Sequence, residues 1–180
     1  MRKLLIVIDM QNDFIDGSLG NPEAQAIIPN VKKKINEYVG NGNPIIFTRD
    51  THFSNYLNTS EGEKLPIKHC IENTHGWQIG IKITPGYYKI IDKCSFGYIG
   101  WENYIDQYVA GTKEYQQTWT IELIGLDTDV CVISNALIIK TLYPEVNITV
   151  DASCCAGSTP EKHKAALEVM KSCQINVIGE

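Results

Sequence analysis

Short apolar runs alternate with helix-like segments along the chain, and this alternation constrains the fold more than any other feature. Residues 4–8 form the first apolar run, and residues 23–38 form the first helix-like segment. Strands that alternate with helices build parallel sheets, because a long crossover returns the chain to the same end of the sheet. Strands that are apolar throughout are typical of sheets covered on both faces. The sequence therefore predicts an α/β fold, a doubly wound six-stranded parallel sheet with helices on both faces.

The element boundaries follow from the same pattern. Strands are expected at residues 4–8, 45–48, 88–91, 119–126, 146–150 and 175–178. Helices are expected at residues 23–38, with an interruption near Pro29, and at 99–109, 130–142 and 159–172. Residues 51–86 lack periodicity, and a loop of this length in a compact domain is usually functional or disordered. A chain of 180 residues fits one domain, residues 1–180.

Charge and composition exclude several classes of function. The net charge of −5 provides no basic surface for nucleic acid. The densest basic run, residues 32–34, is interpreted as the solvated face of a helix. No apolar stretch approaches the roughly 18–20 residues that a membrane span needs. Six cysteines without a CxxC pair, in a chain without an export signal, predict reduced thiols and a cytoplasmic location.

Four chemically active residues follow four different predicted strands. They are Asp9, Asp50, Lys93 and Cys131. In an open parallel sheet, ligands bind beyond the carboxyl ends of the strands, at the point where the strand order reverses. We therefore expect all four side chains to meet at one edge of the sheet.

Cys131 is the strongest candidate for a nucleophile, because it stands where a strand turns into a helix. A helix N-terminus lowers the pKa of a thiol, and its backbone N–H groups can hold an oxyanion. The N–H groups of Val130 and Cys131 are the expected donors. The alternative is a buried cysteine that serves as a small hydrophobic residue, and position alone leaves both interpretations open.

Asp9 and Lys93 could support such a nucleophile. A carboxylate at this edge could take the thiol proton and deliver it to a leaving amine. The lysine could lower the pKa of Cys131 and orient the carboxylate. The alternatives are a strand-end cap for Asp9 and a solvated side chain for Lys93.

The long loop contains a group of residues suited to a metal. Asp50 and His52 form a D-x-H pair, and Glu61 and His69 follow. Carboxylate and imidazole ligands together suit zinc, manganese or iron(II). The alternative is a polar loop in which these side chains form local hydrogen bonds.

Taken together, these segments resemble the isochorismatase-like cysteine hydrolases, a superfamily that includes nicotinamidases and N-carbamoylsarcosine amidases. The resemblance rests on five segments in the family's order, which read LIVIDMQNDF at 5–14, TRDTH at 48–52, PIKHCIENTHG at 66–76, DKCSFG at 92–97 and GLDTDVCV at 125–132. They span nearly the whole chain.

The resemblance implies a catalytic triad of Asp9, Lys93 and Cys131. In such enzymes a thiolate attacks an amide carbonyl, ammonia leaves, and water hydrolyses the thioester. The resemblance also implies a cis peptide bond between Val130 and Cys131. It assigns Phe14 to the substrate pocket.

The resemblance further implies one divalent transition metal (zinc, manganese or iron) and no organic cofactor. The matching ligand positions are Asp50, His52, Glu61 and His69. The sequence departs from the nicotinamidase pattern at two places. Residues 53–57 replace a short histidine-containing stretch, and Leu65 stands where an aromatic residue is expected.

The expected activity is cysteine-dependent hydrolysis of a small-molecule amide C–N bond, with nicotinamide as the best single substrate. One alternative is a metal-independent hydrolase of another small amide or carbamoyl compound. Another is a catalytically silent binding member of the fold. The resemblance also implies a homo-oligomer, and neither nucleic acid nor a membrane is an expected partner.

Overall fold

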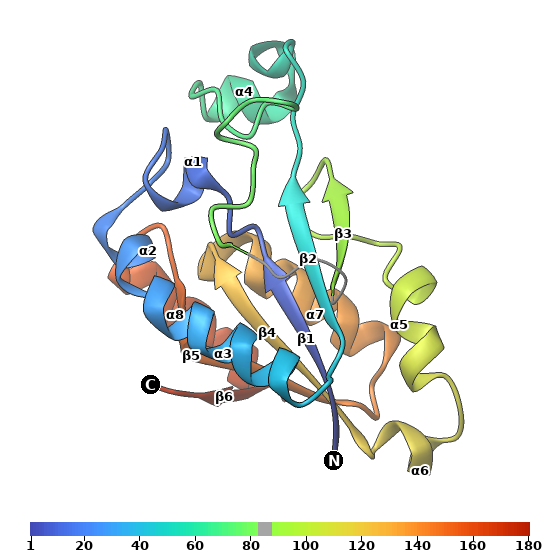
Figure 1. Ribbon diagram of the computed structural model, residues 1–180. Helices are drawn as coiled ribbons and strands as arrows, with labels where there is room; N and C mark the ends of the chain where they lie inside the picture. Colours follow the sequence, from blue (N-terminus) through green and yellow to red (C-terminus); the bar gives the residue numbers. More distant parts are fainter. Residues whose placement is uncertain (83–87) are drawn as a thin grey trace.

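The computed structural model describes residues 1–82 and 88–180. Its strands form one parallel sheet in the spatial order β3-β2-β1-β4-β5-β6 (Figure 1). The strands are β1 (Arg2–Ile8), β2 (Ile45–Asp50), β3 (Tyr88–Lys93), β4 (Trp119–Leu126), β5 (Asn147–Ala156) and β6 (Asn176–Ile178). The chain runs outward from β1 to β3 and then returns to β4, so the order reverses between β1 and β4. The predicted doubly wound six-stranded sheet is confirmed.

Helices cover both faces of this sheet. The α2 (Pro22–Ala26) and α3 (Ile28–Gly40) helices lie on one face, and α7 (Ile133–Leu142) and α8 (Pro160–Ser172) lie on the other (Figure 1). The predicted helix at 23–38 is two helices. Pro29 lies in the first turn of α3, where a residue without an N–H is tolerated.

The remaining helices are short, apart from α5 (Glu102–Val109), which matches the predicted helix at 99–109. The others are α1 (Asn12–Ile15), η1 (Tyr56–Asn58), α4 (Ser60–Lys64) and α6 (Lys113–Gln116). One turn is too short to show a period of 3.6 residues, so the sequence pattern did not predict them. The predicted loop at 51–86 contains two of them, and its residues 83–86 lie outside the described residues.

The first strand forms the centre of the core. Every residue from Leu4 to Ile8 has an exposed fraction of 0%. Strand β4 approaches it closely at Gly125, where φ is 123° and a Cβ atom would collide with the backbone of Ile8. Only glycine accepts both this conformation and this contact readily. The close approach brings the carboxyl ends of β1 and β4 together.

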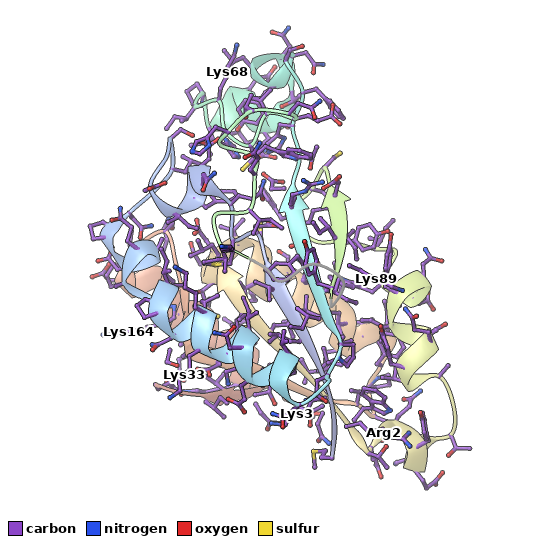
Figure 2. All side chains as sticks on the ribbon, viewed as in Figure 1. Arg2, Lys3, Lys33, Lys68, Lys89 and Lys164 are labelled. Atoms are coloured by element: carbon purple, nitrogen blue, oxygen red, sulfur yellow. The ribbon has the colours of Figure 1, made fainter. Side chains whose placement is uncertain are left out.

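The basic residues are distributed over separate elements rather than gathered in one patch. The labelled cations in Figure 2 show this, with Lys33 on α3, Lys164 on α8 and Lys68 near α4. The predicted solvated face is correct for Lys33 but not for Lys34, whose Nζ pairs with Glu122 at 2.5 Å and Asp151 at 2.9 Å. Within the described residues, no helix is long and apolar enough to cross a membrane.

Candidate active site

The four predicted strand-end residues meet at the carboxyl edge of the sheet. Asp50 and Lys93 are the last residues of β2 and β3 and pair in register. Asp9 directly follows β1, and Cys131 lies in the turn after β4. All four are at most 4% exposed, so the site is buried and a charge there interacts strongly with its neighbours.

Lys93 connects the three other side chains. Its Nζ lies 2.7 Å from Asp9 Oδ2, 3.5 Å from Cys131 Sγ and 3.6 Å from Asp50 Oδ1. It also donates a hydrogen bond to the Ser95 carbonyl at 3.1 Å. Burial alone would lower the pKa of Lys93, but Asp9, Cys131 and Asp50 together raise it, so the lysine is cationic. The predicted solvated alternative for Lys93 does not apply.

Asp9 is held in one orientation by Thr48 in the neighbouring strand. The Thr48 hydroxyl donates to Asp9 Oδ1 at 2.6 Å and accepts from the Asp9 N–H at 3.1 Å. Oδ2 pairs with Lys93 by charge but receives no directed hydrogen bond from the part of the chain that the structure describes, so it keeps a lone pair for a proton. Burial raises the pKa of Asp9, Lys93 lowers it and Asp50 raises it, with a net increase. Thr48 was not among the predicted site residues, although a threonine inside an otherwise apolar strand could have indicated a role in the site.

Cys131 lies in a helical turn, Thr128–Val132, that leads directly into α7. The turn confirms the predicted strand-to-helix position. Two predicted details of this turn are wrong. The cis peptide bond joins Leu126 and Asp127 and not, as predicted, Val130 and Cys131, which lie within the helical turn. The Val130 N–H donates a hydrogen bond to the Asp127 carbonyl at 3.1 Å, so it is not free to hold an oxyanion.

The pKa of the Cys131 thiol also differs from the prediction. Burial raises it, Asp9 raises it further, and Lys93 offsets only part of the increase. The cysteine in this arrangement therefore carries its proton, because burial and the nearby carboxylates disfavour the thiolate. A nearby acceptor must take that proton before the sulfur can act as a nucleophile.

A second cluster lies next to Lys93, on the other side of Asp50. Asp50 Oδ2 lies 2.8 Å from His52 Nε2 and 3.5 Å from His69 Nε2. Glu61 Oε1, from α4, lies 3.6 Å from His52 Nε2 and 3.7 Å from His69 Nε2. Burial would raise the pKa of Asp50, but His52, His69 and Lys93 lower it, so Asp50 is an anionic ligand candidate. Three of the predicted metal ligands, Asp50, His52 and His69, therefore converge, and Glu61 lies beside the two histidines.

The donor set fits a tetrahedral transition metal. Ligand atoms around a zinc ion at about 2.1 Å are separated by roughly 3.4 Å, close to the distances found here. His52 Nε2 is buried and has no hydrogen-bond partner among the described residues, although Asp50 Oδ2 is close. His69 Nδ1 lies 2.9 Å from the Ile67 carbonyl, which as an acceptor requires the proton on Nδ1 and leaves the Nε2 lone pair free. The cluster is compatible with a metal.

Aromatic side chains surround the two histidines. Tyr56 packs against His52 and His69 with ring centroids 4.7 Å and 5.0 Å apart. Tyr56 comes from the stretch that departs from the nicotinamidase pattern, so an aromatic residue from that stretch supports both imidazoles. Phe14 lies 5.7 Å from His69, which places the predicted substrate residue beside the cluster.

Gln11 joins the metal cluster to the first strand and was not among the predicted site residues. Its side chain accepts from the Asp50 N–H at 2.7 Å and donates to the Asp50 and Trp77 carbonyls at 2.8 Å each. It is fully buried. Its place in the DMQND segment, shortly after an apolar strand, is the sequence feature that could have indicated Gln11 as a site residue.

Comparisons with known proteins agree with this fold. A family model described as the isochorismatase domain matches residues 3–179, so the chain belongs to that family. The nicotinamidase of Saccharomyces cerevisiae is 25% identical over 219 residues, with 99% of this chain and 100% of the relative covered.

Two solved structures show the same architecture. The pyrazinamidase of Pyrococcus horikoshii, determined in complex with zinc, has a TM-score of 0.82 and 28% identity, with 100% of both chains covered. The N-carbamoylsarcosine amidase of Thermoplasma acidophilum has a TM-score of 0.77 and 25% identity, with 99% of this chain and 96% of that chain covered. Together these relatives indicate a hydrolase that acts on amide C–N bonds.

Proposed function

We propose that this protein is a cysteine-dependent amidase that hydrolyses a small primary amide through a thioester, with nicotinamide as the preferred candidate substrate. One observation carries the proposal: Lys93 Nζ lies 2.7 Å from Asp9 Oδ2 and 3.5 Å from Cys131 Sγ in a buried site. A carboxylate, an ammonium group and a thiol in contact are the parts needed to activate a sulfur nucleophile.

The first half of the reaction forms the thioester. Asp9 Oδ2 takes the proton of the Cys131 thiol while Sγ attacks the amide carbonyl carbon. Lys93 stabilises the developing thiolate, and the Cys131 N–H is the proposed donor to the oxyanion. Asp9 then returns the proton to the amide nitrogen, the C–N bond breaks, and ammonia leaves.

The second half regenerates the enzyme. Asp9 accepts a proton from a water molecule, whose oxygen attacks the thioester carbonyl, and the carboxylic acid leaves as the C–S bond breaks. Cys131 recovers a proton from Asp9. The raised pKa of Asp9 suits this role, because a carboxylate with a raised pKa is a stronger base once it is ionised.

A metal at the second cluster would be held by Asp50, His52, Glu61 and His69. When bound, it supplies a Lewis acid that can hold a ring nitrogen or a water molecule of the substrate complex. The nicotinamidase names of the relatives and this donor set support nicotinamide as the first substrate to test. Phe14, beside His69, is the proposed wall of the pocket for an aromatic ring.

The test measures ammonia release from a panel of small primary amides and carbamoyl compounds that includes nicotinamide. We expect turnover by the wild-type protein and none by Cys131→Ala. Cys94→Ala is the matched control, because Cys94 follows Lys93 directly but is exposed. Turnover that survives in Cys131→Ala would contradict the cysteine mechanism, and turnover of other amides but not nicotinamide would contradict the choice of substrate.

A further inference from the structure

Asn135 lies one helical turn after the nucleophile and uses its whole side-chain amide. Its Nδ2 donates to the Cys131 carbonyl at 2.8 Å and to the Phe96 carbonyl at 3.0 Å. Its Oδ1 accepts from the Tyr98 N–H at 2.9 Å and from Trp101 Nε1 at 3.0 Å. All four hydrogen-bonding positions of this fully buried amide are therefore occupied, so Asn135 holds the backbone at Cys131 in a fixed position relative to residues 96–101.

The segment fastened by Asn135, residues 95–101, also helps to position the Lys93 ammonium group, which pairs with Asp9 and Asp50 as well. Lys93 Nζ donates to the Ser95 carbonyl at 3.1 Å, at the start of this segment. Gly97 packs so closely on α7 that a Cβ atom would collide with Ile138. The position of the lysine therefore depends on a segment that has no helix or strand of its own and is held through Asn135.

We propose that Asn135 is a positioning residue that sets the contact between Lys93 and Cys131. It binds the nucleophile's own carbonyl on one side and the segment that holds the lysine on the other. The inference rests on the proposed function, since it assigns Asn135 a role in activating the same thiol. Asn135 touches no reacting atom and acts through Lys93.

The charged groups facing Cys131 define what should change without Asn135. Asp9 from β1 and Asp50 from β2 raise the pKa of the thiol, and Lys93 from β3 lowers it. If the segment loosens, Lys93 Nζ loses its contact with the Ser95 carbonyl and shifts away from Cys131 toward Asp9 and Asp50. The pH midpoint of thiolate formation should then rise.

The experiment follows alkylation of Cys131 by iodoacetamide as a function of pH, quantified by peptide mass spectrometry, and needs no substrate. The main variant is Asn135→Leu, which is similar in size and adds no charge. We expect its midpoint to rise by about one pH unit, which lowers the alkylation rate near neutral pH about tenfold. Asn41→Leu is the control, because the exposed Asn41 side chain follows α3 and donates to the Glu37 carbonyl of that helix at 2.8 Å.

A double-mutant comparison separates positioning from general loosening. In a Lys93→Ala background, Asn135→Leu should no longer shift the midpoint, because residues that act through one another are not additive. General loosening would instead raise alkylation at every pH without moving the midpoint. That result, or an unchanged midpoint in folded Asn135→Leu, would overturn the inference.

A second variant covers the case in which Asn135→Leu does not fold. Trp101→Phe removes one donor to Asn135 Oδ1 and leaves the other three bonds in place. We expect a smaller upward shift, and an unchanged midpoint would overturn the inference. A wild-type Cys131 that shows no pH-dependent alkylation would instead contradict the proposed function, so the two failures are distinguishable.

Discussion

Asp9 acquires its chemical properties from its surroundings. Burial and Asp50 raise its pKa, and the Lys93 ammonium group and the Thr48 hydroxyl offset part of this increase. Its backbone φ of 45° lies in the left-handed region, which aspartate tolerates better than most residues. An ordinary strand-end cap would need neither feature, so the geometry favours the proton-transfer role for Asp9.

Replacing Asp9 by Asn should remove the proton acceptor and keep the shape of the site. We expect kcat/KM for the identified amide to fall about 100- to 10,000-fold, the usual contribution of general acid–base catalysis. The wild-type activity should fall on the acid side through a midpoint above the usual aspartate pKa, because the active form of Asp9 is ionised and its pKa is raised. Asp16→Asn, on the exposed surface, is the control and should leave the profile unchanged.

Asp127 is a second unusual carboxylate, at the end of β4. Burial, Asp129 and Asp9 raise its pKa from 3.8 to about 7. Below pH 3.8 both folded and unfolded states are protonated, and between 3.8 and 7 only the unfolded state ionises. The contribution of Asp127 to stability therefore falls as pH rises through this window.

Replacing Asp127 by Asn should stabilise the protein at pH 8 and have little effect at pH 3.5. The gain has an upper limit of about 4 kcal/mol, from about three pKa units at 1.36 kcal/mol each. Urea unfolding at both pH values measures it. A variant that is equally destabilised at both values would show that Asp127 carries no such penalty.

At the residue scale, the sequence was sufficient to predict the site residues that stand at strand ends. Asp9, Asp50, Lys93 and Cys131 meet as predicted because the strands are parallel and share one edge. Thr48, Gln11 and Asn135 could not be found in this way, since their roles depend on which backbone groups come within reach after folding. The thiol pKa was also predicted in the wrong direction, because burial is a property of the packed site.

At the scale of elements, the loop between β2 and β3 depends on the segment after β1. Gln11 binds both backbone groups of Asp50, and Asp13 accepts from the Cys70 N–H at 2.7 Å. Gly76 leaves the space that the Asp13 carboxylate occupies. These contacts explain how a segment with little regular structure can place His52 and His69 accurately.

Gln11→Leu should therefore weaken both stability and metal binding. Three backbone groups lose a partner in a buried place, which we expect to lower the free energy of unfolding by about 3 kcal/mol. Loss of an outer-shell partner typically lowers metal affinity about 10- to 100-fold. Urea unfolding and zinc titration with a competing chelator measure the two effects, with Gln25→Leu on the exposed side of α2 as control. A zinc affinity equal to wild type would contradict the supporting role of Gln11.

Element boundaries were predictable where patterns were long. The bounds of β4 agree with the prediction at both ends, while β5 continues to Ala156, six residues beyond the predicted end. The register shift between Leu123 and Gly125 lets this longer strand continue alongside β4. Alternation of apolar residues does not reveal such irregularities, because they depend on the partner strand.

At the scale of the whole molecule, the Asp9 and Cys131 site lies where the strand order reverses, and the metal cluster lies beside it at the end of β2. Strands β1 and β4 supply Asp9 and the Cys131 turn, and β2 and β3 supply Asp50 and Lys93. Asp50 faces both clusters, with Oδ1 toward Lys93 and Oδ2 toward the histidines. A ligand at the metal cluster therefore connects the sheet to the loop that carries His52, Glu61 and His69, and its binding should stabilise the fold as a unit.

Zinc should raise the thermal stability of the wild-type protein. A ligand at 100 times its Kd that binds only the folded state adds about 2.7 kcal/mol. For a domain of this size the gain corresponds to a Tm increase of roughly 5–10 °C. Differential scanning calorimetry with zinc, and again after addition of a chelator, measures the increase and its reversal.

His69→Ala should abolish the zinc-dependent increase, because it removes one of the three clustered ligands. His75→Ala should retain it, since His75 is exposed and lies outside the cluster. An equal increase in all three proteins would mean that zinc binds elsewhere on the surface. No increase in the wild-type protein would mean that Asp50, His52 and His69 shape the loop through their own contacts, and the metal-independent form of the proposed activity would then account for the site.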